Sequence, residues 1–239
     1  MDGRAEETGV YSNRQIRQAI ASGHIVFHPY IDEHIAGSSI DVTLGYWYYR
    51  TERKSDVGFY NPFCESDVGR YFDGPYHAVV HEIWAEENGR TLFNGIPSDH
   101  PIIVIRPGER ILAHTHEFIG IKAPGTSTMQ ARSTWGRNGI AVCLDAGWGD
   151  PGYINRWTME IYNMNQHESV VLPVGERVAQ LVFYHTGPVD GEYKSISGKY
   201  QTDTSQDIKE IVKTWRPEQM LPRAYKDDRR KPLSVKDMR

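Results

Sequence analysis

Two stretches of this chain share one layout, and they constrain the fold more than any other feature. Residues 101–113 and 170–183 each contain an apolar run, a turn with Pro or Gly, the pair Glu-Arg, and a second apolar run. Such spacing is typical of β-hairpins, so we expect each stretch to be a hairpin and attribute the likeness to hairpin chemistry rather than duplication. Further short runs with turn signals between them predict an all-β barrel or sandwich.

Composition narrows the class of protein. With 239 residues, 39% of them hydrophobic, the chain can bury one core. The formal net charge of −4 gives no general attraction for a nucleic-acid polymer, so a phosphate ligand must be held by a local cluster of Arg and Lys. Such a cluster suits a mononucleotide. The two cysteines, Cys64 and Cys143, do not suggest a disulfide framework, and the apolar runs match neither a signal peptide nor a membrane span. We therefore expect a reduced, cytoplasmic protein without a membrane partner.

Local patterns place a few elements. Ser12 is expected to cap a short helix that ends at Gly23, because Ile16, Ala19 and Ile20 fall on one face. Residues 37–45 alternate polar and apolar side chains, which predicts a half-buried strand. Asp41 in this strand could be a site residue, but a structural, hydrogen-bonded aspartate beside a turn is the favoured interpretation.

The two ends of the sequence differ from its middle. Residues 1–10 are polar and are expected to be flexible, whereas residues 204–215 can form a short helix. Residues 223–239 alternate basic and acidic side chains, so they could be a solvated tail or a strap across a neighbouring subunit. A nucleic-acid-binding arm is the weaker alternative, because several aspartates dilute its charge.

The residues with chemical potential lie between positions 132 and 163. Arg132 and Arg137 bracket two hydroxyl residues, which can bind phosphate oxygens unless the segment is only a solvated turn. Residues 146–153 form a turn rich in Gly and Pro that carries Asp150. Glu160 lies in an otherwise apolar strand, where lost hydration would raise its proton affinity towards the range of general acid/base catalysis. An outward-facing Glu160 is the alternative.

The sequence contains no ligand set for a catalytic zinc ion. One common catalytic zinc site combines a His-x-Glu segment with Pro-Cys-x-x-Cys, and neither occurs here. His114 and His116 lie in an alternating strand without further ligands, so packing or surface roles are favoured for them.

The order and spacing of these segments resemble the dCTP deaminase branch of the dUTPase superfamily, from about residue 11 to residue 201. The resemblance implies a distorted, jelly-roll-like β-barrel of the dUTPase type (β-clip), with a short helix near each end. It also implies a homotrimer with active sites at the subunit interfaces. Residues 11–201 would form the β domain, with an insertion of surface loops at about 50–80, and residues 202–239 a C-terminal helix and charged tail.

The resemblance also implies roles for single residues. Glu160 would act on a bound water without a metal, the position of Ser133 would hold that water, and Arg137 would lie near the base. The nucleotide-binding positions would be Arg132, Thr134, Asp145, Ala146, Asp150, Tyr153, Tyr193, Lys199 and Gln201. Among them, Arg132, Tyr193, Lys199 and Gln201 would contact phosphates, Asp150 the 3′-hydroxyl and Tyr153 the deoxyribose. Mg²⁺ would arrive on the substrate triphosphate.

The chain departs from the family pattern at a few positions. Ala131 replaces a glycine and Thr134 a serine, which are small changes. Asp145 stands where threonine is common, so it could assist proton transfer, indicate a modified cytosine as substrate, or point away and pair with an arginine.

The predicted function is hydrolytic deamination of dCTP to dUTP and ammonia. The alternatives are a dUTP diphosphatase, a bifunctional enzyme that performs both steps, a deaminase of a modified deoxycytidine nucleotide, and a non-catalytic nucleotide-binding regulator.

Overall fold

The computed structural model describes residues 9–51, 58–191, 193, 199–200 and 207–227. The predictions for residues 1–8, Gln201, residues 204–206 and residues 228–239 lie outside this part of the chain.

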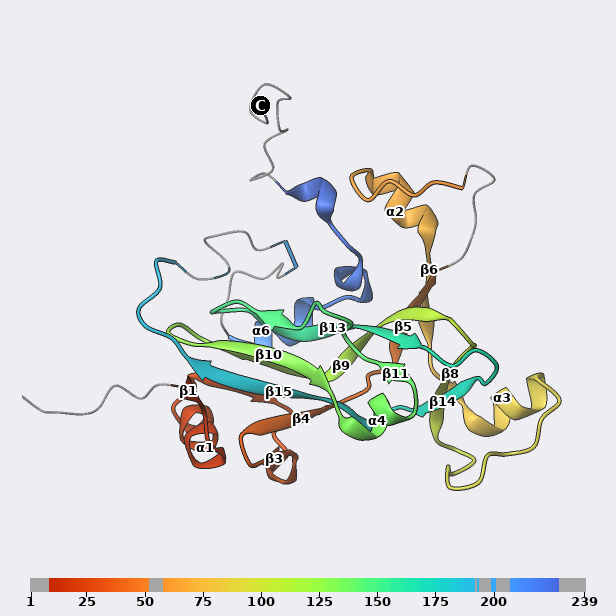
Figure 1. The fold of residues 1–239 in the computed structure, drawn as a ribbon, viewed down its shortest axis with the longest axis horizontal. Helices are drawn as coiled ribbons and strands as arrows, with labels where there is room; N and C mark the ends of the chain where they lie inside the picture. The colour runs from red at the N-terminus through yellow and green to blue at the C-terminus, as the bar shows by residue number, and fades with distance from the viewer. Residues whose placement is uncertain (1–8, 52–57, 192, 194–198, 201–206, 228–239) are drawn as a thin grey trace, which may run out of the picture.

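Two large β-sheets make up the centre of the molecule, and a small sheet lies beside them next to α3 (Figure 1). The first sheet has the order β12 (Trp148–Gly149), β10 (Thr126–Ala131), β15 (Arg177–His185), β4 (Ser39–Thr43) and β3 (Ile35–Ala36), with β1 (Gly9–Val10) on β15. The second has the order β11 (Ile140–Ala141), β13 (Ile154–Asn163), β9 (Arg110–Ile121), β5 (Trp47–Thr51) and β6 (Phe72–His77), with β2 (Ile25–His28) on β9. The small sheet consists of β14 (Val170–Pro173), β8 (Pro101–Ile105) and β7 (Val79–Val80).

Short helices surround the sheets. They are α1 (Asn13–Ala21), α2 (Glu65–Tyr71), α3 (His81–Glu87), α4 (Ser133–Arg137) and α6 (Ile208–Thr214), with 3-10 turns η1 (Asp32–His34), η2 (Pro217–Met220) and η3 (Ala224–Lys226). The predicted β-fold with a short helix near each end is confirmed. Among the described residues, no helix is long and apolar enough to cross a membrane.

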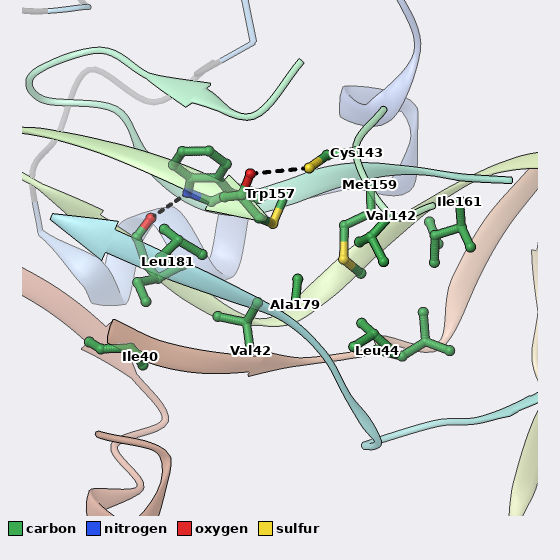
Figure 2. Packing of buried hydrophobic residues seen from close by; sticks show 14 of the residues in the cluster. Ile40, Val42, Leu44, Val142, Cys143, Trp157, Met159, Ile161, Ala179 and Leu181 are labelled. Atoms are coloured by element: carbon green, nitrogen blue, oxygen red, sulfur yellow. Dashed lines mark hydrogen bonds between the residues drawn. The ribbon is translucent and has the colours of Figure 1, made fainter. Parts of the chain in front are cut away.

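The main core lies between the two large sheets. Figure 2 shows side chains of β4 and β15, which are neighbours in the first sheet, facing those of β13 in the second sheet across this space. Along β13, Trp157, Met159 and Ile161 are buried, while the side chains between them are only partly buried and face the other way. The Trp157 indole N–H donates to the carbonyl of Ile119 at 2.9 Å, which satisfies its one polar group inside the core. From Trp157 onward, beyond the register shift between Arg156 and Thr158, this alternation sets which way each side chain of β13 faces.

The two predicted hairpins do not form, and this expectation was wrong. Strand β8 pairs with β14, and β9 and β15 continue into different large sheets. The turn after β8 is fastened to β13 instead: the Asn163 side-chain amide donates to the carbonyls of Ile105 and Arg106, both at 3.1 Å. The amide of Gly108, at φ +65°, donates to the Asn163 carbonyl at 3.0 Å. These long-range hydrogen bonds therefore set the direction of the chain after β8, whereas the local sequence alone favours a hairpin there.

The N-terminal helix follows its sequence signal. Ser12 caps α1 with a capping box, in which its side chain accepts from the Gln15 amide and the Gln15 side chain accepts from the Ser12 amide. Ile16 and Ala19 are buried, as expected.

Residues 58–77 are more regular than the expected surface loops. Helix α2 is followed by β6, which pairs with β5 along the edge of the second sheet. Val68 and Phe72 are buried on the outer face of that sheet. Tyr60 and Tyr71 pack against the same cluster, so the segment is anchored by contacts with the sheet that its irregular sequence pattern does not indicate.

The outer face of the second sheet carries a smaller apolar cluster. Tyr49, Leu112, Phe118 and Ile154 of the sheet pack there with Val68 and Phe72, and with Ile211, Trp215 and Met220 from the C-terminal segment. The guanidinium of Arg156 lies 4.7 Å from the Trp215 ring. Helix α6 confirms the predicted helix for residues 208–214, and residues 223–227 pack on their own chain through the partly buried Tyr225.

Candidate active site

A pocket of about 560 Å³ opens on the outer face of the second sheet. Its floor is formed by β9 and β13, and its walls come from the 58–77 segment, the turn around β12 and the C-terminal segment. Six of the predicted site residues line it: Ala146, Asp150, Tyr153, Glu160, Tyr193 and Lys199. The structure thus gathers residues that are up to 53 positions apart, from 146 to 199.

Glu160 lies on the floor of this pocket. It pairs with Leu112 across β13 and β9, and the alternation of β13 turns it away from Met159 and the main core. Burial raises the pKa of its carboxyl to about 7, while a backbone hydrogen bond and then the charge of Arg110 act in the opposite direction. The Oε2 atom is inaccessible to solvent and has no hydrogen-bond partner among the described residues. An unsatisfied buried carboxyl oxygen in a pocket is a group available to a ligand or a water molecule.

The turn around β12 approaches its neighbours closely because it contains glycines. A Cβ on Gly147 would lie 2.2 Å from the Met129 carbonyl oxygen, and one on Gly149 would lie 2.3 Å from the Trp157 ring. These contacts leave no space for a side chain and hold the turn against β10. Asp150 and Tyr153 follow it, and the Tyr153 amide donates to the Asp150 carbonyl at 3.0 Å. Burial raises the pKa of Tyr153, so this ring presents an uncharged wall.

Another wall of the pocket is formed by Tyr193, Lys199 and Tyr200, which precede α6 in the sequence. The Tyr193 amide donates to the Pro151 carbonyl at 2.8 Å, and its ring lies 5.0 Å from the Tyr153 ring in an edge-to-face arrangement. The Tyr200 amide donates to the Tyr193 hydroxyl at 3.2 Å. These contacts join the segment to the turn that precedes β13.

Lys199 is held by the last described residues. Its Nζ atom lies 2.8 Å from Oδ2 of Asp227, and Arg223 donates to its carbonyl at 2.8 Å. Met220 and Pro222 line the pocket beside it. The ammonium group therefore already has an anionic partner within its own chain.

The predicted phosphate segment lies elsewhere. Ser133, Thr134 and Arg137 are exposed on α4, which lies on the lower side of the sheets in Figure 1, whereas the C-terminal segment lies above them. Arg132 pairs with the buried Asp41, which also accepts from Arg177 at 3.2 Å. None of the four predicted residues lines the pocket. In the described part of the chain, the 132–137 segment and the Glu160 pocket are therefore separate.

Asp41 has the structural, hydrogen-bonded role that the sequence favoured, and Asp145 lies outside the pocket. Asp41 is hydrogen-bonded, as favoured, but its partners are arginines and it lies inside β4 rather than beside a turn. Asp145 is exposed, does not line the pocket, and forms no ion pair within the described part of the chain. The raised pKa of Glu160 has burial as its main cause, not a second carboxylate.

Several pocket residues were missed by sequence reasoning. Tyr60, Phe72, Met220 and Pro222 line the pocket but belong to segments outside the recognised motifs, and Arg110 lies in a stretch that was interpreted only as a hairpin. The 58–77 segment and the 217–222 segment have no periodic pattern that indicates a shared wall. Only their packing on the outer face of the second sheet places them there.

The histidine pair has a structural environment. His114 is buried; the Trp47 amide donates to its Nε2 at 3.1 Å, and its Nδ1 faces the Thr115 carbonyl at 2.8 Å. Burial lowers the pKa of His114 to about 3. Within residues 9–51, 58–191, 193, 199–200 and 207–227, no group of three or more His, Cys, Asp or Glu side chains could hold a metal ion.

Comparison with known proteins agrees with this architecture. Residues 10–186 match a family model described as dCTP deaminase-like. The protein named "dCTP deaminase, dUMP-forming" from Methanopyrus kandleri is 34% identical over 200 residues, which cover 81% of this chain and 91% of the relative. A protein of the same name from Nanoarchaeum equitans is 27% identical over 202 residues, covering 84% of this chain and 97% of the relative.

A solved structure shows the same fold. The 2′-deoxycytidine 5′-triphosphate deaminase from Agrobacterium tumefaciens superposes with a TM-score of 0.52 at 19% identity, over 75% of this chain and 49% of that chain. The family model covers well over half of the sequence, and the first relative is more than 30% identical across most of it. This chain belongs to the dCTP deaminase-like family.

Proposed function

We propose that this protein deaminates dCTP by adding water to the base, with Glu160 as the group that moves protons. The observation that carries the proposal is the Glu160 carboxyl itself, buried on a pocket floor, with a pKa near 7 and an oxygen without a hydrogen-bond partner in the described structure. A general acid/base works best when its pKa is close to the working pH. The names of the two archaeal relatives support cytosine as the base.

The chemistry requires one carboxyl group to act twice. Glu160 takes a proton from a bound water, and the resulting hydroxide adds to C4 of cytosine. The carboxyl delivers this proton to N3, then takes the proton of the new C4 hydroxyl and passes it to the amino group, so that the C4 carbonyl forms as the C4–N bond breaks and ammonia leaves. The step consumes one water, converts cytosine to uracil, and returns Glu160 to its initial state.

The remaining pocket residues fit the other parts of a deoxynucleotide. Asp150 can accept a hydrogen bond from the 3′-hydroxyl, and the uncharged Tyr153 ring can pack on the deoxyribose, where a 2′-hydroxyl would crowd it. Tyr193 and Lys199 can contact phosphate oxygens from the C-terminal wall. Mg²⁺ would travel with the triphosphate, held by its oxygens and by water.

The proposal includes a second copy of the chain at each site. Arg132, Ser133 and Arg137 lie outside the pocket of their own chain, so a neighbouring subunit would bring α4 to it, as in a homotrimer with sites at its interfaces. In this arrangement, Arg132 would contact phosphates, Ser133 would hold the attacking water, and Arg137 would lie near Glu160.

The names of the relatives favour dUMP over dUTP as the final product. Both archaeal proteins are described as dUMP-forming. The bifunctional alternative therefore takes precedence: dCTP and two waters would give dUMP, pyrophosphate and ammonia. The second water attacks the triphosphate of the bound dUTP before it leaves.

A product assay tests the proposal. The purified protein is incubated with dCTP, dUTP or a 5-substituted dCTP, with and without Mg²⁺, and ammonia, dUTP, dUMP and pyrophosphate are resolved. We expect ammonia, dUMP and pyrophosphate from dCTP. Accumulation of dUTP with ammonia would show that the protein only deaminates dCTP. Faster turnover of the 5-substituted dCTP would identify a modified cytosine as the substrate base. Binding without turnover would indicate a regulator.

A further inference from the structure

A second and larger cavity, of about 850 Å³, lies at the other end of the second sheet. It is bounded by β5, β6, α3, β8 and the turn before β14, and it shares no lining residue with the pocket of Glu160. Figure 1 shows α3 and β8 at the far edge of the molecule from the C-terminal segment. The two cavities are therefore separate sites.

One side of this cavity is aromatic. Trp84 of α3 and Phe93 lie with ring centroids 5.3 Å apart at 34°, and Tyr76 is 37% exposed on β6. The buried His81 fixes this surface: its ring stacks on Phe93 at 5.2 Å, and its Nε2 accepts from the Phe93 amide at 2.9 Å. The aromatic surface is therefore preformed rather than dependent on a ligand.

The facing side is cationic. Arg50 is held by Glu109 and donates to the Val104 carbonyl at 3.0 Å, which fixes its guanidinium. Arg106 shares Glu109 at 3.0 Å, but its side chain is 62% exposed. Arg90 is exposed and forms no ion pair within the described part of the chain. Arginines of this kind bind phosphate through paired N–H groups.

We propose that this cavity binds a nucleoside phosphate, with the base against Trp84 and Phe93 and the phosphates at Arg90 and Arg106. Aromatic faces stack on bases of any sequence, and guanidinium groups hold the phosphates, so the two sides together match both parts of such a ligand. The exposed Glu168 on the lining offers an acceptor for a ribose hydroxyl. The volume lies within the range of about 300–1,000 Å³ for small-molecule sites.

Calorimetric titration of the full-length protein tests this site directly. ATP, GTP and UTP are the probes, because they carry a base and phosphates but are not the proposed substrate. We expect at least one of them to bind, while adenosine and inorganic triphosphate alone bind much more weakly. Arg90→Ala should weaken binding about tenfold, the equivalent of one charge-assisted contact. The matched control is Arg14→Ala, a surface arginine on α1.

Two further measurements make the result decisive. Trp84→Leu should also weaken binding, whereas dCTP turnover should stay within about twofold in both cavity variants. A short single-stranded oligodeoxynucleotide is titrated in parallel; tighter binding than the mononucleotides would assign the same base-and-phosphate chemistry to nucleic acid. The proposal is overturned if no probe binds at about 1 mM, if inorganic triphosphate binds as well as the nucleotides, or if neither cavity variant changes the affinity. Because turnover is assayed separately, failure here leaves the deaminase proposal untouched.

Discussion

The floor of the Glu160 pocket and the α4 segment come from neighbouring stretches of sequence, yet they have opposite environments. Glu160 is buried on the outer face of the second sheet, under a wall of C-terminal residues. Ser133 and Arg137 are exposed on a five-residue helix that does not line that pocket. The pocket floor therefore supplies a desolvated acid, whereas α4 presents cationic and hydroxyl side chains to solvent. In the proposed function, the two halves of the chemistry would meet between chains.

The largest expected effect is at the buried half. Glu160→Gln should lower kcat by about a thousandfold or more, since general acid/base groups contribute about 10²–10⁴. The affinity for dCTP, measured by calorimetry, should change little, because the amide keeps the shape of the side chain. Glu87→Gln, at the exposed end of α3, is the matched control. Turnover close to that of the unaltered protein would end the acid/base assignment.

The next effect tests whether the exposed half acts in another subunit. Arg137→Ala alone should reduce turnover about a hundredfold, as loss of a group at the reacting centre does. Co-expressed with the Glu160→Gln chain, it should recover about a quarter of full activity, because mixed oligomers form some sites with both intact residues. Light scattering of the same sample reports whether the particle is a trimer.

No recovery in the mixture, together with a monomeric particle, would place both halves in one chain. The proposal that Glu160 and α4 act together across a subunit interface would then be wrong.

The pH dependence of turnover tests the buried region, because Glu160 has a pKa near 7. The Glu160 pKa is raised to about 7 by burial, and the carboxylate form is the one that takes a proton from water. The value of kcat/KM, which reports groups of the free enzyme, should therefore fall about tenfold per pH unit below about 7 and level off above it. Residual turnover of Glu160→Gln should lack this step. A profile flat down to pH 5 would show that the working base has another identity.

A smaller effect concerns the wall over the pocket. Lys199 is paired with Asp227 at 2.8 Å, so a phosphate must compete with this carboxylate. Asp227→Asn should lower the KM for dCTP about threefold, and Lys199→Met should raise it about tenfold, because the pair is partly exposed and weak but the phosphate contact is charge-assisted. Lys209→Met on α6 is the control. An unchanged KM in both variants would remove Lys199 from the phosphate site.

The smallest effect is at Asp145. Because this side chain is exposed and does not line the pocket, Asp145→Thr should keep dCTP turnover within about twofold. A loss above tenfold, measured in the ammonia assay, would show that the carboxylate joins the site when subunits assemble.

The sequence by itself determined what depends on near neighbours along the chain. The capping box at Ser12, the glycine-rich turn before β13, and the alternation that separates Glu160 from Trp157 and Met159 all follow from local backbone geometry. The resemblance to the dCTP deaminases supplied the roles, and those roles stay predictions where the structure only places the residues.

Tertiary structure decided everything that depends on distant partners. Periodicity says that a strand has two faces, but not which layer covers each face, so the 58–77 and 217–222 walls of the pocket were not foreseen. Strand pairing is equally non-local: Asn163 holds the turn after β8, and β8 therefore pairs with β14 instead of forming a hairpin with β9. The physical reason is that buried hydrogen bonds and apolar faces must find partners, and the whole chain competes to provide them.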